Sequence, residues 1–163
     1  MKCTIKWHKL NEKAIIPTKR IEDAGFDIYT IEDGVTLAPQ EKHLFSTGIC
    51  YDISSGFYLL GFDRGSTGSK GLHLHCGVCD QGYRGEVFVC ICNDNAFPAV
   101  FTSEVSKVEM KDGKLYYPTS KAIAQLIPMQ MPLIESIEVG DDEWEKLKNN
   151  SERGEGKLGN SGK

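Results

Sequence analysis

The chain has 163 residues, of which 40% are hydrophobic and 26% charged, and its formal net charge at pH 7 is −4. This length supports one sizeable core but not two comfortable domains, and the negative charge argues against a partner bound through a nucleic-acid backbone. No apolar run is long enough to cross a membrane, and Met1 is followed by polar residues rather than by an apolar signal segment. A soluble cytoplasmic or other intracellular protein is therefore expected.

Short alternating segments fill most of the chain. Cys3, Ile5 and Trp7 alternate with polar residues, the period of two that predicts a strand with one buried face. Similar runs, separated by clusters of Gly, Asp, Asn and Pro, recur as FDIYTI, KHLFSTGICYDI, GFYLLGF, GLHLHCGV, GEVFVCICN and KAIAQLIPM. Many short strands joined by such turns predict an all-β barrel or sandwich.

The last third of the sequence adds a hairpin, a helix and a polar end. Asp112-Gly113 separates two alternating arms, so residues 104–118 are expected to form a projecting β-hairpin. The segment DDEWEKLKNN opens with acidic residues and predicts one short helix. Residues 151–163 contain one aliphatic side chain, too little apolar surface to order them alone. A β domain of residues 1–150 with a flexible C-terminal arm is predicted.

The stretch HLHCGVCDQGYRGEV, residues 73–87, raises the question of a metal site. Cys76 and Cys79 have the spacing of a zinc knuckle, and Cys90 with Cys92 is a candidate for the second pair of ligands. A gap of one residue is not the usual knuckle spacing, which argues against zinc. Without a secretory signal, the six cysteines are expected to be reduced thiols.

The same stretch has a second interpretation when it is followed onward. GVCDQGYRGEVFVCICN resembles the third motif of the trimeric dUTP diphosphatase (dUTPase) family, which typically reads G-V-I-D-x-D-Y-R-G-E. AGFDIYT resembles the first motif of that family, DRGSTGSKG the second, KAIAQLI the fourth and SERGEGKLGNSG the fifth. Five motifs in the family's order are far more specific than any single one, and they place the cysteines at ordinary strand positions.

The resemblance implies a fold and an activity. The fold is a dUTPase-like distorted jelly-roll barrel, which assembles as a homotrimer with three active sites at the subunit boundaries. The activity is Mg²⁺-assisted hydrolysis of dUTP to dUMP and pyrophosphate, which limits uracil incorporation into DNA. The implied partners are dUTP and further copies of the chain, with no direct nucleic-acid or membrane partner.

The resemblance also assigns roles to residues at the motif positions. Asp80 would activate the water that attacks the α-phosphorus, and Asp27 would hold Mg²⁺ through bound water. Tyr83 would pack under the deoxyribose and leave no room for a 2′-hydroxyl. Further contacts with the base or the phosphate chain are expected from Arg64, Gly65, Ser66, Gly77, Val78, Gln125 and, on the C-terminal arm, Arg153, Leu158 and Gly159.

Several motif positions depart from the family pattern. Gly65 stands where a phosphate-binding serine is normally found, with Ser66 one residue further on as the substitute hydroxyl. Ala122 replaces an arginine, and Gly82 replaces an acidic residue. Leu158 replaces the phenylalanine that stacks on uracil, a loss of roughly 0.5–1.5 kcal/mol and so up to about tenfold in binding or catalysis. An active enzyme is still expected.

Two other functions stay open on the sequence. dCTP deaminases share the fold and often have glycine at the position of Gly82, but their catalytic glutamate falls at Cys90, whose thiol cannot perform the same proton transfers. A catalytically weak nucleotide-sensing or protein-interaction module fits the departures described above, with the hairpin as its contact surface. The presence of Asp80 and Arg153 favours the enzyme.

Overall fold

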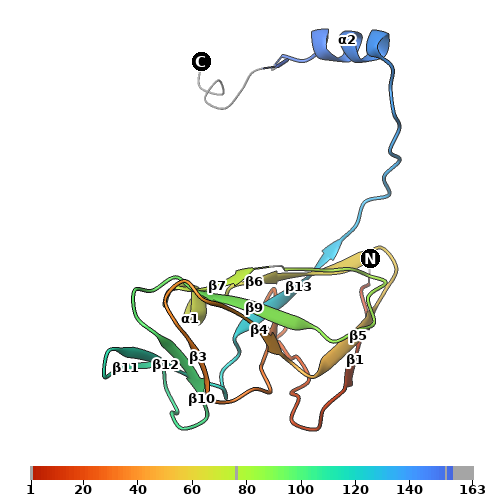
Figure 1. Cartoon of the computed structure of the whole chain (residues 1–163). Coiled ribbons are helices and arrows are strands. Elements are labelled where there is room, and N and C mark those ends of the chain that lie inside the picture. The colour runs from red at the N-terminus through yellow and green to blue at the C-terminus, as the bar shows by residue number, and fades with distance from the viewer. Residues whose placement is uncertain (1, 76, 153, 156–163) are drawn as a thin grey trace. The chain divides into compact units, whose positions relative to one another are not determined.

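The computed structural model describes residues 2–75, 77–152 and 154–155 of the chain, with thirteen strands and two helices among them (Figure 1). The chain divides into two compact units, Met1–Pro132 and Leu133–Lys163. The strands are β1 (Ile5–Lys9), β2 (Phe26–Ile28), β3 (Val35–Leu37), β4 (Lys42–Ser46), β5 (Ile49–Ile53), β6 (Phe57–Phe62), β7 (Leu72–His75), β8 (Val78–Cys79), β9 (Phe88–Asn93), β10 (Ala99–Thr102), β11 (Glu109–Lys111), β12 (Lys114–Pro118) and β13 (Ala124–Gln130). The helices are α1 (Gly65–Gly68) in the first unit and α2 (Asp141–Asn149) in the second.

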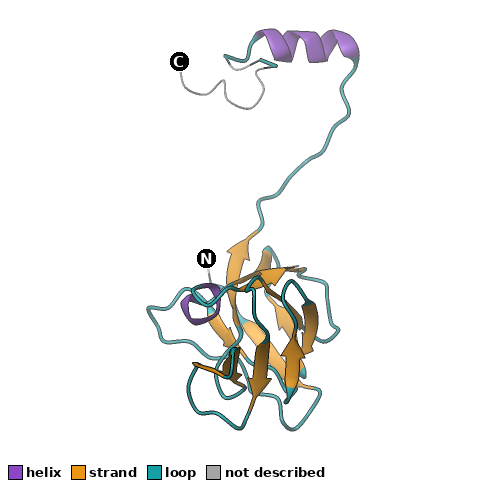
Figure 2. Cartoon of the chain, turned by 60° about the vertical axis from the view of Figure 1, so that its left-hand side comes forward, coloured by secondary structure: helices purple, strands orange, loops and turns teal. Residues whose placement is uncertain are grey.

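The first unit is built from four small sheets, whose strands Figure 2 shows in orange. Their strand orders are β1-β5, β11-β12-β10-β3, β2-β13-β6-β8 and β4-β9-β7. All pairs are antiparallel except β10 with β12. Strands that are distant in sequence are neighbours, as β2 and β13 are, so the chain repeatedly crosses between sheets. The predicted all-β, jelly-roll-like fold is confirmed.

Alternation along the strands produces the core of this unit. In β9, Val89 and Ile91 are buried while Phe88 is exposed, as expected for a strand with one face toward the interior. An aromatic stack crosses the core from β4 to β12, with ring centroids 4.6 Å apart for Phe45 and Phe101 and 5.4 Å apart for Phe101 and Tyr117. Tyr117 thus brings a polar hydroxyl to the end of an apolar stack.

The hairpin of β11 and β12 turns at Asp112 and Gly113, whose φ angles are 49° and 73°. Positive φ at both central residues is the geometry that a two-residue hairpin turn requires, and Asp-Gly adopts it at low cost. Because β12 also pairs with β10, the hairpin continues a four-stranded sheet.

The second unit contains an extended segment followed by α2. The first turn of α2 has three acidic residues and its last turn has Lys146 and Lys148, an arrangement that complements the helix dipole. The first unit ends at Pro132, whereas the sequence-based β domain ended at residue 150. The difference is residues 133–150, which contain no buried side chain.

Two further observations concern the described residues alone. The helices found there are too short and too polar to span a bilayer. The cysteines among them, Cys3, Cys50, Cys79, Cys90 and Cys92, are thiols rather than disulfides.

Candidate functional site

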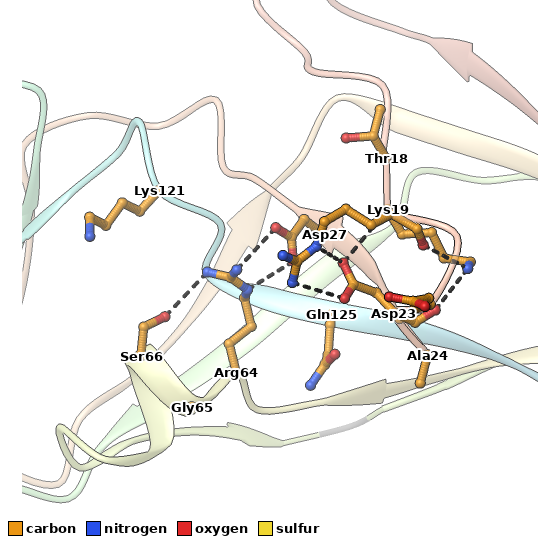
Figure 3. A pocket seen from close by; sticks show the side chains of 13 residues that line it. Thr18, Lys19, Asp23, Ala24, Asp27, Arg64, Gly65, Ser66, Lys121 and Gln125 are labelled. Atoms are coloured by element: carbon orange, nitrogen blue, oxygen red, sulfur yellow. Dashed lines mark hydrogen bonds and ion pairs between the residues drawn. The ribbon is translucent and has the colours of Figure 1, made fainter.

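The first unit contains an open pocket of about 920 Å³, called here the large pocket (Figure 3). The loop before β2, the start of α1 and the start of β13 form its walls, so it collects residues from the first, second and fourth motifs. Four basic and three acidic side chains line it, an excess of positive charge that suits an anionic ligand. The lining residues are Thr18, Lys19, Arg20, Glu22, Asp23, Ala24, Gly25, Asp27, Arg64, Gly65, Ser66, Lys121 and Gln125.

An ion pair between Arg64 and Asp27 lies in this pocket. Arg64 Nε is 2.8 Å from Asp27 Oδ1, and Arg64 Nη2 donates to Asp27 Oδ2 at 3.0 Å. The two residues are 37 positions apart and are brought together because Asp27 lies in β2 while Arg64 is the N-cap of α1. The paired geometry fixes the plane of the guanidinium group.

Gln125 lies next to this ion pair. It faces Asp27 across the β2–β13 ladder, and its side-chain Nε2 donates to the carbonyl of Asp63 at 2.8 Å. Gly25 leaves space for the other end of the amide, since a Cβ at position 25 would lie 2.6 Å from Gln125 Oε1. A glycine in the first motif thus makes room for the glutamine of the fourth motif.

Ser66 and Gly65 complete the second motif in the same pocket. Arg64 Nη1 donates to Ser66 Oγ at 3.2 Å, which Figure 3 shows on the side of the guanidinium away from Gln125. Ser66 Oγ also lies 3.2 Å from the hydroxyl of Tyr117. A Cβ on Gly65 would meet no atom within 4 Å. The serine hydroxyl therefore contacts protein atoms, while the position before it is open.

Asp80 lines a different and smaller cavity, of about 230 Å³. The carbonyl of Asp80 accepts hydrogen bonds from the hydroxyl of Tyr51 at 2.6 Å and from the amide of Tyr83 at 3.1 Å. The ring of Tyr83 is held across the turn, where its hydroxyl donates to the carbonyl of Glu86 at 2.9 Å. The residues around this cavity are Leu44, Val78, Cys79, Asp80, Tyr83, Glu86, Val87 and Phe88.

The predicted site residues thus fall into groups within one chain. Asp27, Arg64, Gly65, Ser66 and Gln125 share the large pocket, whereas Val78, Asp80 and Tyr83 line the small one, and the two cavities have no lining residue in common. Gly77 precedes β8, and its carbonyl accepts a hydrogen bond of 2.6 Å from the amide of Gly61. Arg153, Leu158 and Gly159 lie outside the described residues.

Motif reasoning did not identify several residues that shape these cavities. The loop with Lys19 and Arg20 forms part of the large pocket, and the run KRIED ahead of the first motif was the available signal. Tyr51 and Tyr117 lie in strands whose alternating pattern predicts burial but says nothing of where a hydroxyl points. Asp63 accepts the hydrogen bond of Gln125 with its backbone carbonyl, and a sequence pattern does not reveal backbone contacts of this kind.

Burial alters the acidity of the groups around Asp80. Burial raises the pKa of the Cys79 thiol, and the neighbouring Asp80 carboxylate raises it further. Burial likewise raises the pKa of the Tyr51 hydroxyl above its usual range. Both groups are therefore neutral at physiological pH, and the carboxyl side chains that line this cavity are those of Asp80 and Glu86.

The donor set of the large pocket fits Mg²⁺ better than zinc. Among the residues that the structure describes, no three His, Cys, Asp or Glu side chains are grouped to hold a metal ion. Mg²⁺ needs less from a protein, because it keeps several waters and takes oxygens from one or two carboxylates and from substrate phosphates. Asp27 supplies such a carboxylate in a pocket that also suits phosphate.

An all-β fold with an arginine, a carboxylate and an amide gathered in one open pocket fits a class of proteins that bind phosphate-bearing ligands. Within that class, the sequence model of the dUTPase family matches residues 11–162. The chain belongs to the dUTPase family and is an enzyme of that type.

Individual relatives agree with this assignment. The deoxyuridine 5′-triphosphate nucleotidohydrolase of Nautilia profundicola is 34% identical over 100% of both chains, and that of Mycobacterium tuberculosis is 32% identical over 99% of this chain and 97% of its own. Among solved structures, the dUTPase of Staphylococcus bacteriophage 80alpha with dUpNHpp has a TM-score of 0.72 at 28% identity, covering 98% of this chain and 99% of that one. A mutant dUTPase from phage phi11 of S. aureus, described for its coordination of a structural Mg(II) ion, has a TM-score of 0.69 at 26% identity, covering 86% of this chain and 99% of that one.

Proposed function

We propose that the chain hydrolyses dUTP to dUMP and pyrophosphate, with Asp80 activating the attacking water. The observation that carries this proposal is the large pocket, which Asp27, Arg64 and Gln125 from three motifs line together, with Asp27 paired to Arg64 and opposite Gln125 in the β2–β13 ladder. A triphosphate repels an attacking oxygen, so its hydrolysis needs positive or N–H donors along the phosphates and a base for the water. The pocket offers the donors, and Asp80 offers the base.

The phosphate chain is assigned to Arg64, Gln125 and Lys121. After its bonds to Asp27 and Ser66, the Arg64 guanidinium keeps one N–H on each Nη atom, a pair suited to two phosphate oxygens. Gln125 Nε2 has a second N–H beyond the one given to Asp63. Asp27 would hold Mg²⁺, which neutralises charge on the phosphate oxygens when it is bound.

The base and sugar are assigned to the small cavity, where Tyr83 would pack under the deoxyribose and the backbone around Gly77 and Val78 would read the uracil edge. Because the two cavities of one chain share no lining residue, we propose that a complete site joins the large pocket of one subunit to the small cavity of another in a homotrimer. Arg153, Leu158 and Gly159 on the C-terminal arm would then cover the bound nucleotide.

Mixing two inactive variants tests this arrangement. Asp80→Asn removes the base and should lower kcat by about a hundredfold or more, and Arg64→Gln removes the guanidinium. The Asp80→Asn subunit keeps Arg64 and the Arg64→Gln subunit keeps Asp80, so a mixed trimer has one interface at which both residues are intact. Subunits refolded together should therefore regain hydrolysis that neither variant shows alone. A matched control mixes each variant with itself. Failure of the mixed trimers to regain activity would place both residues in a site within one subunit.

A further inference from the structure

A buried tyrosine hydroxyl lies behind the wall of the large pocket, in contact with the lining residue Ser66. Tyr117 lies in β12 with its side chain fully buried, and its ring stacks on Phe101 in the core. Its hydroxyl reaches the carbonyl of Ala122 at 2.8 Å and Ser66 Oγ at 3.2 Å. One rigid core side chain therefore contacts both the second and the fourth motif.

The direction of these hydrogen bonds follows from what each group can do. A backbone carbonyl only accepts, so the single proton of the Tyr117 hydroxyl points to Ala122. The Tyr117 oxygen must then accept the proton of the Ser66 hydroxyl. Ser66 Oγ in turn accepts from Arg64 Nη1 at 3.2 Å. The chain of bonds runs from Arg64 through Ser66 and Tyr117 to Ala122, and the Tyr117 hydroxyl also interacts directly with Arg64.

This order leaves Ser66 with no proton for a phosphate oxygen. The bond to Ser66 also holds Nη1 of Arg64, whose Nε and Nη2 atoms are bonded to Asp27. With all three nitrogens held, the remaining N–H groups on Nη1 and Nη2 have one direction in the pocket. A guanidinium fixed in this way loses little freedom when it binds two phosphate oxygens side by side.

We propose that Tyr117 and Ser66 are positioning residues that aim Arg64 at the phosphate chain, and that the Ser66 hydroxyl does not itself bind phosphate. The proposal rests on the proposed function, because it assigns a role within the same pocket. It replaces the sequence-based expectation that Ser66 supplies the phosphate-binding hydroxyl absent at Gly65. It also gives the buried hydroxyl of Tyr117 a role in substrate affinity.

A double-mutant cycle separates the two roles of Ser66. Ser66→Ala, Tyr117→Phe and the double variant are compared with the unchanged chain for KM and kcat on dUTP, and for affinity toward dUpNHpp by calorimetry. Each single change should raise KM and weaken dUpNHpp binding by about three- to tenfold with kcat little altered, and the double variant should be no worse than the worse single variant. Effects that multiply in the double variant, or an inert Tyr117→Phe, would overturn the proposal.

Two controls make each outcome interpretable. Tyr116→Phe removes a hydroxyl from the neighbouring position of β12 and should change neither parameter, while melting temperatures show which variants are folded. Hindered rotation of the Arg64 guanidinium, followed by NMR without any ligand, should be faster in both Ser66→Ala and Tyr117→Phe than in the unchanged chain. Unchanged rotation in both variants would contradict the positioning role of Ser66 and Tyr117. If the unchanged chain neither hydrolyses dUTP nor binds dUpNHpp, the proposed function itself is contradicted instead.

Discussion

The hydroxyl of Tyr51 donates a hydrogen bond of 2.6 Å to the backbone carbonyl of Asp80. Tyr51 lies in β5, is 2% exposed, and packs against Trp7 with their ring centroids 6.0 Å apart. The loop that carries Asp80 is thus tied to the core by a side chain that has almost no freedom to move. The position of the Asp80 carboxylate therefore depends on the packing of β5 as well as on its own loop.

Replacing Tyr51 with Phe removes this bond without changing the shape of the core. If Asp80 is the base, as proposed, we expect kcat for dUTP to fall by about three- to tenfold with KM within about twofold, because a less well-fixed base lowers transition-state stabilisation more than ground-state binding. Tyr58→Phe, which removes a hydroxyl from a half-buried position of β6, is the matched control. A kcat equal to that of the unchanged chain would show that the bond serves stability alone.

The buried tyrosines also determine how stability changes at alkaline pH. Burial raises the pKa of both Tyr51 and Tyr117 above their ordinary value near 10. Above about pH 10 the unfolded chain releases these phenolic protons while the folded chain keeps them, so the free energy of unfolding falls as pH rises. Denaturant midpoints measured from pH 8 to pH 11 should decline less steeply in Tyr51→Phe. An unchanged slope would contradict the effect of burial on this residue.

Gly25 tests the contact between the first and fourth motifs. A Cβ at this position would lie 2.6 Å from Gln125 Oε1 and 3.1 Å from Gln125 Cβ, so Gly25→Ala should push the amide out of place. We expect about a tenfold rise in KM for dUTP, since one charge-assisted hydrogen bond is lost. Gly140→Ala, whose new Cβ would meet no atom within 4 Å, is the control. A Gly25→Ala chain with normal KM would remove Gln125 from phosphate binding.

The sequence predicted the general plan of the fold for a physical reason. Alternation in segments such as FVCICN reports which face of a strand is buried, and β9 follows it at Val89 and Ile91. Asp112-Gly113 reports a turn because few other pairs accept positive φ at both positions. Local patterns of this kind depend only on neighbours in the chain.

The site was predictable only in part, because its geometry depends on residues that are distant in the sequence. The motifs identified Asp27, Arg64 and Gln125, which the fold brings into one pocket. Patterns along the chain carry no information on the distance between Asp80 and that pocket, nor on the direction of the Tyr51 hydroxyl. These properties arise from the crossing of strands between sheets, which only the folded chain displays.

Removing the residues after Asn150 tests the role assigned to the C-terminal arm. The buried hydrophobic side chains of the described residues all lie between Ala14 and Leu126, and residues 151–163 contain one aliphatic side chain, so the melting temperature and the oligomeric state should be unchanged. Hydrolysis of dUTP should be lost nearly completely, because the arm would close over the phosphates and exclude water. The comparison uses calorimetry, light scattering and pyrophosphate release on the same samples. Loss of folding on truncation would show instead that the arm is structural.

The activity of the protein is tested by pyrophosphate release from dUTP, dCTP, dTTP and UTP in the presence of Mg²⁺, with ammonia release from dCTP followed in parallel. We expect pyrophosphate from dUTP alone, because in the proposed arrangement Tyr83 would exclude ribonucleotides and the backbone beside Asp80 would read uracil. Ammonia from dCTP would instead indicate a deaminase. Binding of dUTP without turnover of any nucleotide would contradict dUTP hydrolysis and indicate a module that senses nucleotides.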